Sequence, residues 1–126
     1  MSIETLTQEA IELLKNLIAT QSFSSEEEGT AALIENWFKA HDIPFKRQAN
    51  NIWATNKNFE EGKTTLLLNS HHDTVQPNNG YTRDPYSPDI EDGKLYGLGS
   101  NDAGGCLVSL IATFTYFYAQ ENPKYN

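Results

Sequence analysis

The chain has 126 residues, enough for one hydrophobic core and too few for two complete domains. Its formal charge of -8 opposes contact with nucleic-acid phosphates and with anionic membrane surfaces. No apolar run approaches the roughly 20 residues of a membrane helix, and the N-terminus has no secretory signal pattern. Because Cys106 is the single cysteine, no internal disulfide can form, which fits a reducing cytoplasm. We therefore expect a cytoplasmic protein that binds neither nucleic acid nor membranes.

Two amphipathic helices are predicted near the beginning of the chain. Apolar side chains recur at helical spacing from residue 6 to residue 19, and Thr5 and Gln8 stand at the spacing of a capping box. A polar, acidic stretch then precedes a second helix, which either Ser24 or Ser25 can cap. Each helix has one apolar face, so both are expected to cover the core.

The middle of the chain predicts strands, because the helical spacing is lost after Pro44. A hairpin is expected there, with its second strand at residues 52–55 and its turn at Asn50-Asn51. Residues 64–69 follow a polar turn, and their continuous apolar character is typical of a central strand covered on both faces.

The last part of the chain predicts a loop, a tight turn and a helix. Residues 76–92 are rich in Pro, Asn, Gly and Asp, which favours a loop, and Asp92-Gly93 is a hairpin-type turn. An apolar helix is expected from Asp102 to about Ala119, buried against a sheet. Helices interleaved with strands indicate a three-layer α/β fold, and the small number of strands indicates that its sheet is incomplete.

The segment after the predicted central strand holds the first candidate site residues. Residues two apart in an extended chain point to the same side, so His71 and Asp73 can project together while His72 points away. A neutral imidazole is a good zinc ligand, and a nearby carboxylate can hold its ring in orientation. Taken alone, however, the triplet is more simply interpreted as a solvated or hydrogen-bonded strand end.

A glycine-rich turn carries the next candidate, Asp102. This residue stands near the start of the last helix, where it can act as a helix cap or as a ligand. The glycines around it resemble a dinucleotide-binding fingerprint, but Asp102 occupies the position of the third glycine. Since a carboxylate there would repel a pyrophosphate, we do not favour nucleotide binding.

Three ordered segments, LLLNSHHDTV, TRDPYSPDIEDGKLYGLG and SNDAGG, resemble one known family. It is the di-zinc amidohydrolase and peptidase family that includes acetylornithine deacetylase, succinyl-diaminopimelate desuccinylase, aminoacylase and carboxypeptidase G. The opening helix followed by LIATQSFSSEEE is also similar to this family, and GLGSNDAGG looks most like acetylornithine deacetylase relatives. The resemblance implies that residues 1–126 are the amino-terminal part of a zinc-peptidase-like catalytic domain.

The resemblance implies roles for three residues. His71 corresponds to a histidine ligand of one zinc ion, Asp73 to the catalytic aspartate, and Asp102 to the carboxylate that bridges two zinc ions. It further implies a metal-activated water that hydrolyses an amide bond in a small N-acyl amino acid, acetylornithine-like, or in a peptide. Cobalt is a possible substitute for zinc, and amino-acid biosynthesis is the implied setting.

The sequence also departs from the family pattern. Leu98, Gln76 and the pair Ala103-Gly104 stand where Arg, Pro and Met-Lys are frequent, although none of these positions is a ligand. The family's adjacent glutamate pair, its remaining ligands and its dimerisation domain are not found in the chain. We therefore expect the chain alone to be inactive and the full-length protein to be a homodimer. The alternative is a non-catalytic binding or interaction module that retains the fold.

Four other residues are assigned structural roles. Cys106 lies on the apolar helix, so a small buried side chain is expected and not a nucleophile. His41 has no partner at ligand spacing and is expected on the surface. Trp37 and Trp53 are expected to contribute to packing.

Overall fold

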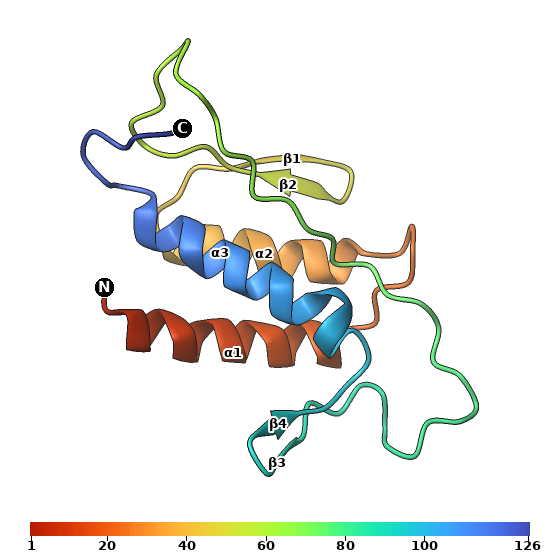
Figure 1. Cartoon of the computed structure of the whole chain (residues 1–126). Coiled ribbons are helices and arrows are strands. Elements are labelled where there is room, and N and C mark those ends of the chain that lie inside the picture. Colours follow the sequence, from red (N-terminus) through yellow and green to blue (C-terminus); the bar gives the residue numbers. More distant parts are fainter.

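Three helices and two small hairpins make up the fold of residues 1–126, described by a computed structural model (Figure 1). The helices are α1 (Ile3–Ala19), α2 (Glu28–Ala40) and α3 (Gly105–Phe117). The hairpins are antiparallel: β1 (Lys46–Gln48) pairs with β2 (Asn51–Trp53), and β3 (Ile90–Glu91) pairs with β4 (Lys94–Leu95). The two hairpins lie on opposite sides of the helices (Figure 1). None of the helices combines the length and apolar character needed to span a membrane.

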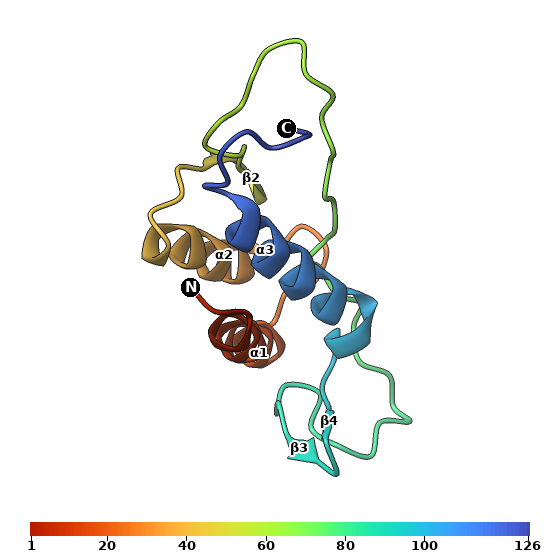
Figure 2. The same ribbon diagram turned by 60° about the vertical axis from the view of Figure 1, so that its left-hand side comes forward.

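The apolar faces of the three helices form the core. Viewed nearly along α1, the other two helices pack beside it and cross one another (Figure 2). Most core residues follow the helical spacing of the sequence, as expected for amphipathic helices. The buried cluster consists of Leu6, Ala10, Leu13, Leu17, Ile34, Trp37, Phe38, Ile43, Leu107, Val108 and Ile111.

The predicted helices are confirmed, but their first residues differ from the expectation. α1 begins at Ile3, and the Ser2 hydroxyl accepts a hydrogen bond from the Thr5 amide at 3.1 Å, so Ser2 is the cap and Thr5 is not. α2 has Glu27 at its N-cap position and no side-chain cap. Ser25 adopts a left-handed backbone, with φ of 73°. Ser24 forms a contact elsewhere, described below.

Both predicted hairpins are present. The first turn lies at Ala49-Asn50, one residue before the expected Asn50-Asn51, because Ala49 is the residue that takes a positive φ of 54°. The second turn lies at Asp92-Gly93 as predicted. Both residues of this turn have positive φ, which is the backbone of the tight turns that suit twisted hairpins.

Residues 64–69 are not the buried central strand that the sequence predicts. The side chains of Leu66 and Leu67 are 63% and 79% exposed. Only Asn126 pairs with this segment: its amide donates to Thr64 O at 2.9 Å, and its carbonyl accepts from the Leu66 amide at 2.8 Å, as between parallel strands. A strand becomes central only when neighbours lie on both edges, and this segment has a single paired residue on one edge.

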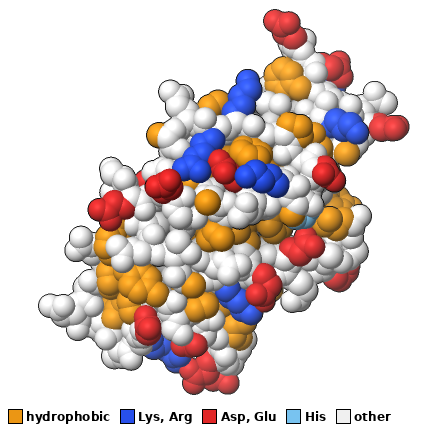
Figure 3. Space-filling model, turned by 180° about the vertical axis from the view of Figure 1, so that it is seen from behind, with side chains coloured by type: hydrophobic (Ala, Val, Ile, Leu, Met, Phe, Trp, Pro, Cys, Tyr) orange, Lys and Arg blue, Asp and Glu red, His pale blue; other side chains and the backbone are white.

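The helices and short strands fit a partial α/β domain, while the three-layer α/β fold stays a prediction. Several large apolar side chains remain exposed outside the core, among them Phe59, Val75 and Ile90. Apolar groups are visible among acidic and basic ones on the rear face (Figure 3). The exposed apolar groups show that the helical core covers only part of the chain's apolar surface.

Three structural assignments from the sequence are wrong. Cys106 is exposed, because it points away from the buried side of α3. Trp53 is 44% exposed at the end of its short strand. His41 is largely covered: its ring stacks on Trp37 with centroids 4.4 Å apart, and its Nε2 lies 3.0 Å from a carboxylate oxygen of Glu9.

Candidate metal centre

The loop between α1 and α2 holds the His71 segment in place. The Thr74 amide donates to the Ser22 carbonyl at 2.7 Å, and Phe23 and Thr74 form an isolated parallel bridge. Ser22 is buried, which anchors the contact to the helical core. The extended backbone around Thr74 then places alternate side chains on opposite sides.

His71 lies between two carboxylates. Its Nδ1 is 3.0 Å from Oδ1 of Asp73, and its Nε2 is 3.2 Å from Oδ1 of Asp102. Because an ionised carboxylate only accepts hydrogen bonds, Nδ1 donates to Asp73. The structure therefore brings together the three residues singled out in the sequence, although their roles in catalysis remain predictions.

Asp73 is held from its other side by Ser24. The Ser24 hydroxyl donates to Oδ2 of Asp73 at 2.6 Å. This hydrogen bond lowers the pKa of Asp73 below its ordinary value of 3.8, the contact with His71 lowers it further, and partial burial opposes both effects. Ionised Asp73 therefore stabilises the fold at pH values above 3.8. This contribution to stability is lost as the pH falls through the lower pKa of the folded state. At neutral pH Asp73 is a carboxylate that can orient His71.

His72 points to the opposite side, as the alternation predicts. Its Nδ1 lies 2.8 Å from the Thr30 hydroxyl, and its Nε2 lies 2.9 Å from the Asn50 carbonyl. Thr30 is fully buried on α2, and Asn50 lies in the first hairpin turn. His72 therefore links a helix to a hairpin and belongs to the structure of the chain, not to the candidate site.

Replacing His72 with alanine is expected to destabilise the chain by about 1–3 kcal/mol, because it removes the partner of two fixed polar groups. Urea unfolding of the chain measures this loss. His71→Ala is the matched control: His71 is 53% exposed, so its loss should leave the free energy of unfolding within about 0.5 kcal/mol of the wild type. Equal stability of the two variants would contradict the linking role.

Asp102 lies in an irregular turn before α3 and does not cap that helix. The turn, η1 (Ser100–Gly104), is π-helical in its hydrogen bonding, but Asp102 itself has extended angles, φ -117° and ψ 95°. The peptide bond after Asp102 is cis. The cap position of α3 is Gly104, and no side chain caps the helix. The Asp102 side chain is 91% exposed and free to take a ligand.

Two glycines make this turn possible. Gly99 has a positive φ of 76°, which favours a residue without a Cβ. The Gly104 amide donates to the Gly99 carbonyl at 2.8 Å, and a Cβ on Gly104 would lie 2.6 Å from that oxygen. The glycines thus close the turn tightly and leave Asp102 at its outer side, facing His71.

His71, Asp73 and Asp102 line one groove with a volume of about 560 Å³. Its other walls come from residues 74–75, 80–85 and 96–101. Arg83 is the only Lys or Arg in the lining, and it is already paired with Glu91 and stacked over the ring of Tyr96. The open groove gives a small molecule access to the space between His71 and Asp102.

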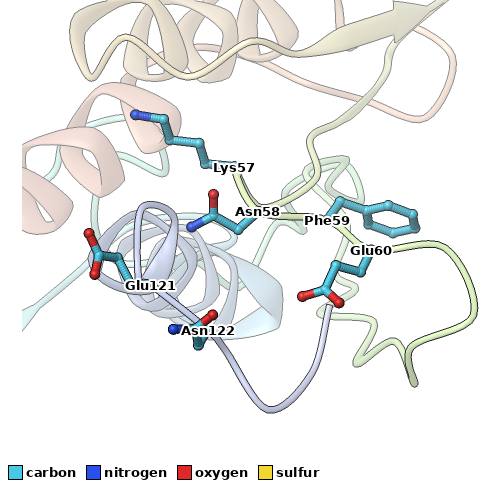
Figure 4. Close-up of a pocket in the computed structure, with 6 residues that line it drawn as sticks. All are labelled: Lys57, Asn58, Phe59, Glu60, Glu121 and Asn122. Carbon is cyan, nitrogen blue, oxygen red and sulfur yellow. The ribbon is translucent and has the colours of Figure 1, made fainter.

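A second hollow of about 540 Å³ lies near the other end of α3 (Figure 4). α3 has 13 residues, so its ends are about 20 Å apart. The lining residues are Lys57, Asn58, Phe59, Glu60, Glu121 and Asn122. None of them is a histidine or cysteine, so the donor chemistry of the His71 groove has no counterpart there.

The donor types and their spacing fit a zinc ion, but their number does not complete a site. A neutral imidazole that donates from Nδ1 has a lone pair on Nε2, and this nitrogen lies 3.2 Å from an oxygen of the Asp102 carboxylate. Two ligands about 2.0–2.1 Å from a tetrahedral zinc ion are about 3.3 Å apart, close to the observed 3.2 Å. No three His, Cys, Asp or Glu side chains converge into a ligand group, however. The chain by itself therefore holds no complete ligand group, and His71 and Asp102 are two candidate ligands of one.

Ser24 is the residue of this site that sequence reasoning missed as a site residue. Its position before a helix suggested a cap, and its partner Asp73 is 49 residues away. No spacing rule connects such residues, so only the folded chain reveals the contact.

Comparison with known proteins places the chain in a family. The model of peptidase family M20/M25/M40 matches residues 67–126, which include His71, Asp73 and Asp102. The chain is 36% identical over 117 residues to a protein named acetylornithine deacetylase from Shigella sonnei (strain Ss046). This match covers 82% of the chain, and the chain spans about 30% of the length of that relative. The chain belongs to peptidase family M20/M25/M40.

Proposed function

We propose that the chain is one part of a metal-dependent hydrolase that cleaves an amide bond in a small N-acyl amino acid or a peptide. The line of contacts from Asp73 through His71 to Asp102 is the observation that carries this proposal. Family membership supports hydrolysis, and the name of the Shigella relative supports an acetylornithine-like substrate.

Three residues have distinct roles in this proposal. His71, through Nε2, and Asp102 would hold zinc, with Asp102 as the carboxylate shared by two ions and cobalt as a substitute. Asp73 holds the His71 proton on Nδ1, so that the Nε2 lone pair stays available. When bound, the two metal ions activate a water molecule and polarise the amide carbonyl. The groove beside these residues receives the substrate.

The complete active site needs residues outside this chain. Catalytic zinc normally has three protein ligands, while His71 and Asp102 supply only two for a pair of ions. A general base and the remaining ligands belong, in this proposal, to further sequence of the complete protein, which is a cytoplasmic homodimer of amino-acid biosynthesis. The 126-residue chain alone then binds zinc weakly and does not hydrolyse the substrate. Nothing observed favours the alternative of a non-catalytic module.

Metal removal tests the proposal. A strong chelator should abolish hydrolysis of N-acetylornithine by the complete protein, and added zinc or cobalt should restore it, because the metal generates the nucleophile. Hydrolysis is followed by release of free ornithine. An apoprotein treated with magnesium is the matched control and should stay inactive. Undiminished turnover after verified removal of all metal would refute the proposal.

A further inference from the structure

Asp73, the partner of His71 Nδ1, is held by a contact between two distant parts of the chain. Ser24, in the loop between α1 and α2, donates to Oδ2 of Asp73 at 2.6 Å. The other oxygen of the same carboxylate, Oδ1, faces Nδ1 of His71 at 3.0 Å. Each oxygen of Asp73 thus has its own partner, and the carboxylate cannot rotate without losing one of them.

The position of Ser24 is itself anchored. Two residues before it, the carbonyl of buried Ser22 accepts from the Thr74 amide at 2.7 Å, and Phe23 bridges to Thr74. These backbone contacts lie immediately beside Ser24 and Asp73 on their two segments. The hydroxyl is therefore presented to the carboxylate by fixed backbone, and its placement needs little further ordering.

A second carboxylate lies close to the other ring nitrogen of His71: Nε2 is 3.2 Å from Oδ1 of Asp102, a contact without hydrogen-bond geometry. Asp73 is 36% exposed, whereas Asp102 is 91% exposed and can rotate freely in water. A neutral imidazole carries one proton, which can reside on Nδ1 facing Asp73 or on Nε2 facing Asp102. Only the first arrangement leaves Nε2 able to bind a metal ion.

We propose that Ser24 is a positioning residue of the metal centre: its hydroxyl fixes Asp73, and fixed Asp73 keeps the His71 proton on Nδ1. Ser24 does not touch the metal or the substrate in this role. It determines which nitrogen of His71 is available, and so raises the affinity of the site for a cation. The inference rests on the proposed function for its biological purpose, but the proton position can be measured without metal or substrate.

The test is the tautomer of His71, read from the nitrogen chemical shifts of the ¹⁵N-labelled chain without metal. The spectrum is recorded at an alkaline pH at which the nitrogen shifts of the ring no longer change with pH, so that only the two neutral tautomers contribute. The wild type should show the proton mainly on Nδ1. Ser24→Ala should shift the population toward Nε2, and Ser24→Thr should restore it, because threonine keeps the hydroxyl.

Ser25→Ala is the matched control, since the Ser25 side chain has no hydrogen-bond partner in the fold while its amide bonds to Glu27. It should leave the His71 spectrum unchanged.

Ser24→Ala should also weaken zinc binding by the complete protein roughly 3- to 10-fold. This loss is smaller than the 10- to 100-fold typical of residues that contact a ligand directly, because Ser24 contacts Asp73 and not His71. Competition with a coloured chelator measures that change.

The outcomes separate the two proposals. A wild-type proton on Nε2, a Ser24→Ala spectrum equal to the wild type, or a Ser24→Thr spectrum equal to that of Ser24→Ala would each overturn the role of Ser24. If the spectra behave as expected but the complete protein neither holds zinc nor hydrolyses N-acyl amino acids, the positioning survives and the proposed function fails. If the complete protein hydrolyses N-acyl amino acids normally but the His71 tautomer does not change in Ser24→Ala, the proposed function survives and the positioning role of Ser24 fails.

Discussion

Under the proposed function, replacing Asp102 with alanine should abolish hydrolysis by the complete protein and remove at least one of the two proposed zinc ions. Two divalent ions about 3.5–4 Å apart repel each other, and an anion between them offsets that repulsion. The Asp102 side chain is 91% exposed and makes no contact that supports the core, so its loss should not unfold the chain. We expect turnover to fall at least about a thousandfold, since metal activation supplies several kcal/mol of the lowered barrier.

Glu121→Ala provides the control for this experiment. It removes one carboxylate from the other end of α3, beside the second hollow, and should leave zinc content and turnover unchanged. Zinc is counted by atomic absorption on the purified variants, and thermal unfolding checks that both are folded. Two zinc ions and normal turnover in Asp102→Ala would refute the bridging role.

Replacing Asp73 with alanine should reduce turnover by about 10- to 100-fold, with a smaller loss of zinc affinity than in Asp102→Ala. The reason is that Asp73 contacts His71 and not the space between His71 and Asp102. Without it, His71 keeps its place in the chain but loses the carboxylate at its Nδ1, and only the backbone carbonyl of residue 73, at 3.3 Å, remains as an acceptor there. Steady-state kinetics and chelator competition on the same preparations separate the two effects.

Asp73→Asn refines this prediction, because the amide oxygen can still accept from His71 Nδ1 without a full charge. Its turnover should lie between those of the wild type and Asp73→Ala. If Asp73→Ala lost zinc as completely as Asp102→Ala, Asp73 would be a ligand and the assigned roles would be wrong.

The helices could be predicted because their apolar spacing decides their packing. Residues such as Leu13 and Ile34 are buried on the faces that the helical period selects. Helix starts were less predictable, since several hydroxyl and acidic side chains compete near each one. Ser2 caps α1 in place of Thr5, and Ser24 hydrogen-bonds to Asp73 and does not cap α2.

The apolar run at residues 64–69 shows where local pattern fails. Its composition is typical of a central strand, but burial of a strand depends on neighbours that the sequence of the strand does not contain. Here Asn126 is the only residue whose backbone pairs with it. Its leucines therefore stay exposed, although the composition of the segment suits a strand with neighbours on both edges.

The candidate site could also be predicted only in part. The alternation of His71, His72 and Asp73 predicted which side chains project together, because strand geometry is local. The resemblance placed Asp102 in the same site, and the glycine turn explains how it faces His71. Ser24 could not be found in this way, since its contact with Asp73 arises only when the loop after α1 meets a distant segment.

Anomalous diffraction from crystals of the zinc-loaded complete protein tests the central claim most directly. We expect two zinc peaks about 3.5–4 Å apart that share the Asp102 carboxylate. One of them should lie about 2.0–2.1 Å from His71 Nε2, while Asp73 contacts only Nδ1 of that ring. Zinc bound at positions that exclude His71 and Asp102 would contradict it.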